Sequence, residues 1–400
     1  MLGRHLTLRV TIPFDSLSAE TGPGAGSATL ERPQPALVDD APLDAPLWGI
    51  VFAGGIGSRF WPLSTPERPK PVLHLLGERP LLADTVHRLA PMIPPSRTLV
   101  VTSRDIAPAV RRAIPSIPAA NVLVEPRPLG TAAAYAWALE TVLERAGPTA
   151  VAIAMHADLA VAFPDEFRRV LRRAATLALR HDVLLSLGVT PTRPETAFGY
   201  AVAAEPLDPA LPVAQGGALN VVQFVEKPRL DAVATLLNDG AYWHTGVVVA
   251  RAVVALEELF TRAHEIAPGR DALAAGHLPV FAGMIRPISI ERGLLERSPR
   301  LAMLPLDCGW DDVGTWACLR RTRDLDDAGN GAIGRAVFVE STSNVVHTEA
   351  GTVVLFGCER MLVVTLNGIT FVTPLDRAAD LNPLLEQLPG SLRRDPTRPL

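Results

Sequence analysis

The sequence predicts an α/β protein in which a mostly parallel sheet is flanked by helices and followed by a small β unit. Three observations indicate this fold. Short apolar runs alternate with helical patterns over residues 47–190. Residues 331–375 contain only brief β-type runs with turns between them. The chain of 400 residues is 48% hydrophobic and 20% charged, which suits a domain of about 250 residues with a smaller partner.

Charge and cysteine content exclude several classes of protein. The formal net charge of −4 lacks the basic excess of a dedicated nucleic-acid binder. No apolar run approaches the ~20 residues that a membrane-spanning helix needs, and no signal-peptide pattern is recognised. The three cysteines form no C-x-x-C pair, so we expect neither a disulfide framework nor a structural zinc site. We therefore expect a cytoplasmic protein with no nucleic-acid or membrane partner.

The predicted elements begin after an extension. Residues 1–46 are rich in Pro, Gly, Ala and acidic residues and are expected to be flexible. The first strand, Trp48–Ala53, runs into a glycine-rich loop. The strands expected after it are Thr98–Thr102, Val122–Glu125, Ala150–Met155 and Val183–Val189. The helical patterns cover residues 81–89, Ile106–Ile114, Thr131–Arg145 and Asp165–Arg180. In such sheets, ligands bind beyond the carboxyl ends of the strands.

After residue 195 the pattern loosens. Shorter strands are expected at Gly199–Ala203, Leu219–Val225 and Gly246–Ala250, before a helix-rich stretch over residues 251–275. The turn-rich segment Asp324–Gly331 predicts a boundary, so we expect a main domain over residues 47–325 and a β unit over 330–385. The β runs of that unit are Ala336–Val339, Val345–His347, Val353–Phe356, Met361–Thr365 and Thr370–Val372. Their spacing leaves a β-helix-like arrangement open.

The loop after the first strand has the features of a phosphate cradle. In Ala53-Gly54-Gly55-Ile56-Gly57-Ser58-Arg59, the glycines allow backbone amides to approach a phosphate closely. No Gly-Lys-Ser/Thr follows, and Phe60 occupies the third glycine position of a dinucleotide fingerprint. Of the 38 basic residues only Lys70 and Lys227 are lysines, and Lys70 follows the loop in a proline-stiffened segment. A plain tight turn is the alternative for the glycines alone.

Two aspartates are candidate ligands of Mg²⁺. Asp158 follows the apolar run Ala150–Met155, which places it at the carboxyl end of a buried strand, and Asp312 lies between Trp310 and Trp316. Carboxylates that meet near phosphates suit Mg²⁺, which takes one or two of them and fills its other positions with water and phosphate oxygens. A helix N-cap for Asp158 and a turn position for Asp312 are the alternatives.

The second lysine also has a carboxylate beside it. Glu226 and Lys227 follow the end of an apolar strand. An ammonium group suits a phosphate group of a ligand, and a carboxylate suits hydroxyl groups, whereas an exposed ion pair at a strand end is the alternative.

The motifs, taken together, resemble those of one family. The segment GGIGSRFWPLSTPERPKP (54–71) carries a Trp-Pro-Leu-Ser tetrad. The motifs that follow it are Glu125-Pro126 with Gly130-Thr131-Ala132, Thr196-Ala197-Phe198-Gly199-Tyr200, Phe224-Val225-Glu226-Lys227-Pro228, Trp243-His244-Thr245-Gly246, Ser289-Ile290-Glu291 and Trp310-Asp311-Asp312-Val313-Gly314-Thr315-Trp316. As a set over residues 48–316, they resemble the mannose-1-phosphate guanylyltransferases of the sugar-nucleotide pyrophosphorylase superfamily. The resemblance implies a Rossmann-like nucleotide-diphospho-sugar transferase fold. It also implies transfer of GMP from GTP to mannose 1-phosphate, giving GDP-mannose and pyrophosphate.

The resemblance also implies roles for individual residues. The catalytic set is Arg59, Lys70, Asp158 and Asp312, with Mg²⁺ on the two aspartates. The nucleotide is expected at Gly54, Gly55, Gly57, Ser58, Arg59, Lys70, Glu125 and Thr131. The sugar phosphate is expected at Gly199, Glu226, Lys227, His244 and Thr245. A homodimer formed through the C-terminal β unit is a further implication.

Several positions depart from the family pattern. They are Pro71, Gly130, His156, Leu159, His244, Thr245 and Glu291. Because all are expected near the pocket, the choice of nucleotide and sugar is less constrained than the reaction class. Two alternatives stay open: a pyrophosphorylase with another sugar 1-phosphate or nucleotide, and a catalytically weak paralogue that binds sugar nucleotide and regulates a partner. Retention of both lysines, Arg59 and both aspartates favours an active enzyme.

Overall fold

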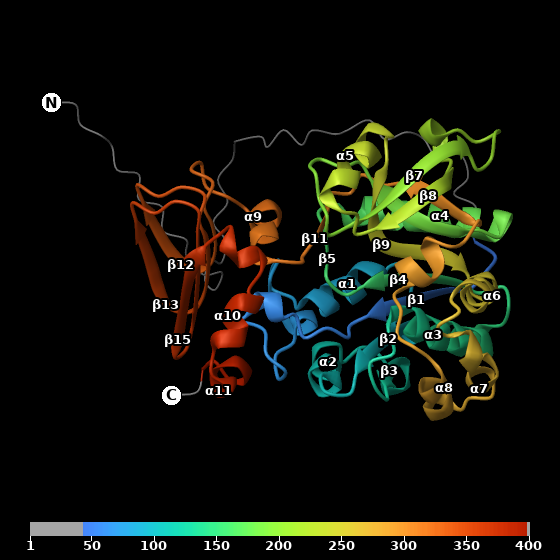
Figure 1. Ribbon diagram of the computed structural model, residues 1–400, viewed down its shortest axis with the longest axis horizontal. Coiled ribbons are helices and arrows are strands. Elements are labelled where there is room, and N and C mark those ends of the chain that lie inside the picture. The colour runs from blue at the N-terminus through green and yellow to red at the C-terminus, as the bar shows by residue number, and fades with distance from the viewer. Residues whose placement is uncertain (1–42, 398–400) are drawn as a thin grey trace, which may run out of the picture. The chain divides into compact units, whose positions relative to one another are not determined.

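The computed structural model describes residues 43–397, and these form two compact units. The larger unit comprises residues 43–57 and 66–313, and the smaller unit comprises residues 58–65 and 314–397 (Figure 1). The extension expected over residues 1–46 lies outside the described residues except for 43–46. In the described part of the chain, no helix is long and apolar enough to cross a membrane.

The larger unit is built around a mixed sheet. Among residues 43–313 this sheet has nine strands in the order β3-β2-β1-β4-β9-β6-β10-β8-β7. The bounds of these strands are β1 Leu47–Phe52, β2 Thr98–Ser103, β3 Val122–Glu125, β4 Val151–His156, β6 Leu184–Val189, β7 Gly199–Pro206, β8 Leu219–Glu226, β9 Tyr242–Arg251 and β10 Leu301–Pro305.

The α/β class is confirmed, but the expectation of a mostly parallel sheet is wrong. β1 is parallel to β2 and β4, β2 to β3, and β6 to β10. In contrast, β9 lies antiparallel between β4 and β6, and β7 and β8 form an antiparallel edge pair. A parallel pair needs a crossover, usually an α-helix. Residues 207–218, which join β7 to β8, form no α-helix, and so the chain reverses there.

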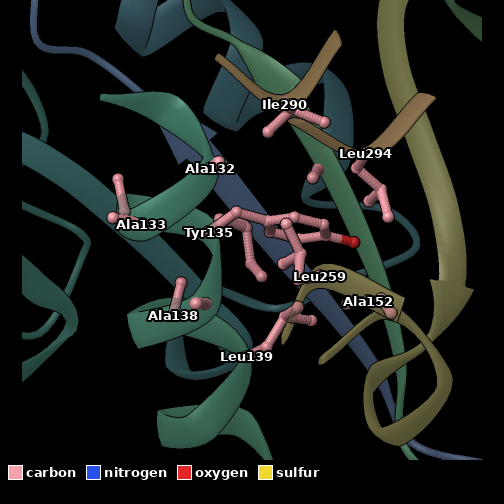
Figure 2. Packing of buried hydrophobic residues seen from close by; sticks show 14 of the residues in the cluster. Ala132, Ala133, Tyr135, Ala138, Leu139, Ala152, Leu259, Ile290 and Leu294 are labelled. Carbon is pink, nitrogen blue, oxygen red and sulfur yellow. The ribbon is translucent and has the colours of Figure 1, made fainter. Parts of the chain in front are cut away.

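Helices cover both faces of this sheet. Their bounds are α1 Leu81–Leu89, α2 Ala107–Ala113, α3 Thr131–Ala146, α4 Pro164–His181, α5 Leu230–Asn238, α6 Ala252–Arg262, α7 Arg270–Ala274 and α8 Leu278–Met284. Ile50 of β1 is buried in the cluster with α3 and α6, whereas Val51 is buried in the cluster with α1, α2 and α4. The side chains of neighbouring strand residues point to opposite faces of the sheet, so a single apolar run contributes to the hydrophobic cores on both faces. Figure 2 shows Tyr135 of α3 packed toward Leu259 of α6 and Leu294.

The smaller unit contains a second sheet. The described strands of this sheet are β12 Gly331–Val339, β13 Val345–Phe356, β14 Met361–Leu366 and β15 Ile369–Pro374, and the helices of the unit are α9 Leu319–Thr322, α10 Asn382–Gln387 and α11 Gly390–Arg394. β12, β13 and β14 are successive parallel neighbours, whereas β15 is antiparallel to β14. The runs expected as separate strands at Val345–His347 and Val353–Phe356 belong to the single strand β13. Parallel neighbours joined by short connections are typical of a β-helix, although the final antiparallel strand is not.

Buried asparagines connect the turns of this unit. The side-chain oxygen of Asn330 accepts hydrogen bonds from the backbone and side-chain nitrogens of Asn344, at 3.0 and 2.9 Å. The Asn344 side chain donates to the carbonyl of Cys358 at 3.0 Å and accepts from the backbone N–H of Met361 at 2.9 Å. These bonds satisfy backbone groups that would otherwise be buried without partners.

Residues 58–65 belong to the smaller unit because their aromatic side chains pack there. Phe60 lies 5.3 Å from Trp316, and Trp61 lies 5.4 Å from Phe371, between ring centroids. Trp316 is also 5.8 Å from the ring of His347. Consequently the units divide after Val313, and the segment expected as a boundary, residues 324–331, lies inside the smaller unit.

Candidate active site

A cavity of about 350 Å³ lies where β1, β3 and β4 end in the larger unit. The described residues that line it are Phe52, Ala53, Gly54, Gly55, Lys70, Pro71, Val101, Glu125, Pro128, Leu129, Gly130, Thr131, Ala134, His156, Ala157 and Asp158. It therefore lies beyond the carboxyl ends of parallel strands, where ligands of such sheets bind.

The glycine-rich loop places Lys70 in this cavity. Gly57 has a φ of +80°, and a Cβ added there would lie 2.4 Å from the Cβ of Lys70. The backbone N–H of Lys70 donates to the carbonyl of Ile56 at 2.8 Å. Glycine is thus required at position 57, because a side chain would collide with the segment that carries the lysine. Ser58 and Arg59 belong to the smaller unit, and Arg59 is exposed.

Lys70 forms an ion pair with Asp158. The Lys70 ammonium donates to the carboxylate of Asp158, and the two side chains are 13% and 24% exposed. Burial opposes ionisation of Asp158, but the Lys70 ammonium holds the pKa of this carboxyl below its usual range. The pair therefore presents a charged carboxylate and an ammonium at the end of β4.

A two-stranded ladder brings Asp312 close to Asp158. Strand β11, Trp310–Asp312, is antiparallel to β5, Leu159–Val161, with Asp312 opposite Leu159. The N–H of Val313 also reaches the carbonyl of Asp158 at 3.3 Å. Burial raises the pKa of Asp312 to about 6; the carboxylate of Asp158 adds to the rise, and Lys70 opposes it. The two aspartates predicted to share a metal are thus electrostatic neighbours.

The donor set fits Mg²⁺. Mg²⁺ takes one or two carboxylates from a protein, and water and phosphate oxygens complete its coordination shell. Asp158 and Asp312 supply two carboxylates, and Asp158 already faces the ammonium of Lys70. Within residues 43–397, no group of three or more His, Cys, Asp or Glu side chains could hold a metal. An ion bound by Asp158 and Asp312 would therefore need substrate oxygens as well.

Arg193 supports this region, although no pattern in the sequence identified it as a site residue. Its guanidinium lies 4.8 Å from the Trp243 ring centroid and 3.6 Å from the Asp311 carboxylate. Asp311 in turn accepts from the backbone N–H of Asp312 at 2.9 Å. The contacts connect Arg193 to the strand that carries Asp312. One arginine among many, in a turn-rich loop, has no pattern that would distinguish it.

The connection from β3 to α3 forms another part of the cavity wall. Glu125 accepts from the N–H of Leu129 at 3.2 Å, and burial raises the pKa of its carboxyl. Gly130 has a φ of +82°, and a Cβ added there would lie 2.6 Å from the backbone N and O of Ile288. The hydroxyl of Thr131 accepts from the N–H of Ile290 at 2.9 Å. Glu125 and Thr131, both expected to bind nucleotide, are thus fixed by backbone contacts.

Three of the residues expected to bind the sugar phosphate form a second cluster. Gly199 pairs with Glu226 across β7 and β8, and a Cβ added at Gly199 would lie 2.9 Å from the Glu226 carboxylate. The Lys227 ammonium donates to Glu226 at 2.7 Å while its side chain is 58% exposed. Burial raises the pKa of Glu226, although Lys227 opposes the rise. None of these three residues is among the described residues lining the 350 Å³ cavity.

His244 and Thr245 are buried in β9. The Ser186 hydroxyl lies 2.7 Å from Nδ1 of His244, and burial lowers the pKa of His244 to about 4. The Thr245 hydroxyl donates to the carbonyl of Leu187 at 2.8 Å, and the residue is 1% exposed. This hydroxyl is therefore held against the backbone of β6.

Three of the positions that depart from the family pattern interact with one another. Burial opposes ionisation of Glu291, but His156 and His244 together hold its pKa below the usual range. His156 lines the cavity and also interacts electrostatically with Asp158 and Asp312. His156 therefore connects the cavity to His244 and Glu291. A fourth, Leu159, is a buried core residue.

Residues 48–327 match the family described as nucleotidyl transferase. A mannose-1-phosphate guanylyltransferase of Sinorhizobium fredii is 28% identical over 354 residues, which are 84% of this chain and 67% of that protein. The mannose-1-phosphate guanylyltransferase of Escherichia coli is 28% identical over 367 residues, 87% of this chain and 75% of that protein. A crystal structure titled as a mannose-1-phosphate geranyltransferase from Thermus thermophilus is 30% identical, with a TM-score of 0.76, and the match covers 85% of this chain and 98% of that one.

Proposed function

The chain belongs to the nucleotidyl transferase family, and we propose that it transfers GMP from GTP to mannose 1-phosphate, giving GDP-mannose and pyrophosphate. The observation that carries this proposal is the meeting of Lys70, Asp158 and Asp312 beside a cavity bordered by the glycine loop. Relatives with the name mannose-1-phosphate guanylyltransferase support the choice of substrates.

The reaction needs positioning more than proton transfer. A sugar 1-phosphate is already an anion at neutral pH, so its oxygen can attack the α-phosphorus of GTP without a general base. The difficulty is the mutual repulsion of two anions while pyrophosphate departs in line. Catalysis should therefore consist of holding both substrates and neutralising their charge.

The residues of this chain divide these tasks. The amides of Gly54 and Gly55 are assigned to the triphosphate, with Arg59 favouring the departing pyrophosphate. Lys70 is assigned to the transferring phosphoryl group, and Lys227 to the phosphate of the incoming sugar. When bound by Asp158 and Asp312, Mg²⁺ would supply Lewis-acid stabilisation of charge on the phosphate oxygens. With Lys70 already ion-paired to Asp158, substrate phosphate oxygens would compete for the ammonium.

The sugar is the less constrained substrate. Glu291, His156 and His244, all departures from the family pattern, form one interacting group beside the cavity. This observation favours, as a second candidate, an active pyrophosphorylase that takes another sugar 1-phosphate.

A substrate panel tests both candidates. Pyrophosphate release is measured with GTP, ATP, UTP or dTTP, each against mannose 1-phosphate and glucose 1-phosphate, with and without Mg²⁺. We expect the GTP and mannose 1-phosphate pair to give the highest kcat/KM, and only with the metal. Preference for a pair that contains glucose 1-phosphate would support the second candidate, and preference for another nucleotide with mannose 1-phosphate would contradict both. Binding of sugar nucleotide with no turnover of any pair would instead indicate a regulatory paralogue.

A further inference from the structure

The loop between β6 and β7, residues 190–198, is attached to the strand that follows it. The Tyr200 hydroxyl of β7 donates to the carbonyl of Glu195 at 2.7 Å and accepts from the N–H of Glu195 at 3.2 Å. The Glu195 carboxylate accepts from the N–H of Ala197 at 3.1 Å. Tyr200 is buried in the larger unit, so these bonds fix the loop to its core. A side chain carried by this loop therefore extends from a defined backbone position.

Arg193 of this loop lies among aromatic rings and carboxylates. Its guanidinium is 4.8 Å from the ring centroid of Trp243 in β9 and 5.7 Å from that of Phe198. Its Nε lies 3.6 Å from Oε2 of Glu195, and its Nη2 lies 3.6 Å from Oδ1 of Asp311. The side chains of Arg193 and Asp311 are 26% and 13% exposed, so water and salt screen this ion pair less than a fully exposed one. Ring faces and charges together restrict the orientation of the planar guanidinium.

Two contacts from the loop reach β11. Besides the ion pair of Arg193 with Asp311, the ring of Phe198 lies 5.4 Å from that of Trp310. The Asp311 atom that faces Arg193 is Oδ1, and the same oxygen accepts from the backbone N–H of Asp312 at 2.9 Å. The ladder between β11 and β5 covers three residues of each strand, so side-chain contacts are needed to fix the position of β11. Arg193 therefore acts on the oxygen that holds the backbone of Asp312.

We propose that Arg193 is a positioning residue for the reaction: through Asp311 it fixes β11, and so it holds the Asp312 carboxylate where it can share an ion with Asp158. This inference rests on the proposed function, in which the two aspartates hold Mg²⁺. Side chains that orient a metal ligand without touching the metal typically change metal affinity or activity by about 10- to 100-fold when they are replaced. An effect of this kind is expected at Arg193.

Amide hydrogen exchange tests the position of β11 without metal or substrate. The full chain and its Arg193→Gln variant are exchanged in metal-free buffer, and mass spectrometry follows the peptide that contains residues 310–313. We expect exchange of this peptide to be about threefold faster or more in Arg193→Gln, because Asp311 has lost the cation beside it, whereas a peptide of β1 should be unchanged. Arg193→Lys should restore most of the protection, because it keeps a cation near Asp311. Equal exchange in the parent chain and Arg193→Gln would overturn the proposal.

The Mg²⁺ dependence of turnover tests the consequence for Asp312. With saturating GTP and mannose 1-phosphate, Arg193→Gln should raise the half-activating Mg²⁺ concentration and lower kcat, each about tenfold, while KM for mannose 1-phosphate changes less than about twofold. Arg193→Lys should lie closer to the parent chain. The matched control is Arg270→Gln, which removes an exposed guanidinium 5.7 Å from the ring of Phe260 and should change none of these values. A higher KM for mannose 1-phosphate with an unchanged Mg²⁺ dependence would mean that Arg193 acts on the sugar position near Gly199, and the proposal would fail.

A double-mutant cycle tests the route through Asp311. Asp311→Asn keeps an oxygen for the N–H of Asp312 but removes the charge that attracts Arg193. Arg193→Gln should therefore raise the half-activating Mg²⁺ concentration about tenfold in the parent chain, but less than about threefold in the Asp311→Asn chain. The same tenfold rise in both chains, each shown to be folded by thermal melting, would contradict the route. If no substrate pair were turned over, the proposed function would fail, and amide exchange would still decide whether Arg193 fixes β11.

Discussion

Each lysine of this chain faces a carboxylate, but the two pairs differ in exposure. Lys70 and Asp158 are 13% and 24% exposed, whereas Lys227 is 58% exposed beside a Glu226 that is 8% exposed. A mobile ammonium on a long side chain can leave its partner for an incoming phosphate at low cost. Lys227 therefore suits binding of a substrate, and Lys70 suits a fixed position beside the carboxylates that are proposed to hold Mg²⁺.

This difference predicts separable kinetic effects. Lys227→Ala should raise KM for mannose 1-phosphate about 10- to 100-fold, with a much smaller change in KM for GTP. Asp312→Asn should instead lower kcat by about 100-fold or more, because it removes one of the two carboxylates that are proposed to hold Mg²⁺. Steady-state kinetics of both variants with each substrate varied in turn check this. Equal and mild effects from both substitutions would contradict the assigned roles.

His244 predicts an acid sensitivity of the fold. Burial lowers its pKa to about 4, whereas an unfolded histidine titrates near 6.5. Below pH 6.5 the unfolded chain binds a proton that the folded chain does not, so stability falls as the pH decreases from 6.5 toward 4. At pH 5.5 the loss from this group is about 1.4 kcal/mol relative to pH 7.5.

The measurement is denaturant unfolding at these two pH values. His244→Gln should lose less stability between pH 7.5 and 5.5 than the parent chain does. The control, His87→Gln, replaces an exposed histidine of α1 and should leave the difference unchanged. If His244→Gln kept the full pH dependence, His244 would have to be charged in the folded state.

At the scale of elements, the turn between β3 and α3 depends on one glycine. A Cβ added at Gly130 would lie 2.6 Å from backbone atoms of Ile288, which cannot move as a flexible side chain can. Gly130→Ala should therefore destabilise the fold by about 2 kcal/mol or more and raise KM for GTP, since Gly130 lines the cavity. Gly147→Ala is the matched control. Gly147 also has a positive φ, of +76°, but no atom lies within 4 Å of an added Cβ.

Thermal melting and GTP kinetics of these two variants separate two costs of the added methyl group: the backbone strain of a positive φ, and the collision with Ile288. Gly147→Ala should cost only about 1 kcal/mol and leave KM for GTP unchanged. Similar losses in both variants would mean that the positive φ alone, and not contact with Ile288, determines the cost at Gly130.

The C-terminal sheet depends on its buried asparagines. Asn344→Ala removes two hydrogen bonds that the side chain donates and one that it accepts. The carbonyl of Cys358 and the N–H of Met361 then lose these partners. Leaving buried polar groups unsatisfied costs about 1–3 kcal/mol each, so we expect a loss of about 3 kcal/mol. Unfolding monitored in denaturant checks this, with the exposed Asn382→Ala as a control near zero. A loss below about 1 kcal/mol would contradict the role of these bonds.

Elements with a strong apolar pattern were predictable, and short ones were not. β1, β2, β3, β4 and β6 lie within about a residue of the expected strands, because each is a buried run with clear limits. β5 and β11 have three residues each, too few for any period, and yet this pair brings Asp312 to Asp158. Proximity of the two aspartates was therefore expected only from the family resemblance. The direction of β9 could not be predicted either, because strand pairing is set by contacts distant in sequence.

At the scale of the whole molecule, the two units do not follow one another along the chain, because the smaller unit contains two separate segments. Residues 58–65, which follow β1 and the glycine loop, lie in the smaller unit with residues 314–397. Phe60, Trp61 and Leu63 are at most 4% exposed there. The segment that follows the glycine-rich loop therefore packs against side chains from the C-terminal part of the chain. The boundary expected near residue 325 was predicted from the composition of a short segment. Composition describes only residues that are neighbours in the chain, so it could not show that residues 58–65 pack with the C-terminal segment.

This arrangement predicts the result of truncation. A chain ending at residue 325 would retain the nine-stranded sheet but lose Phe371 and His347, the ring partners of Trp61 and Trp316. We expect it to bind a hydrophobic dye, to aggregate on concentration and to lack turnover, because Phe60 and Trp61 would be exposed next to the glycine loop. Dye fluorescence and size-exclusion chromatography measure this against the full chain. Trp61→Ala and Phe371→Ala in the full chain should couple by about 0.5–1.5 kcal/mol in a double-mutant cycle. A soluble, active truncated chain, or additive effects of the two substitutions, would mean that residues 58–65 do not depend on the smaller unit.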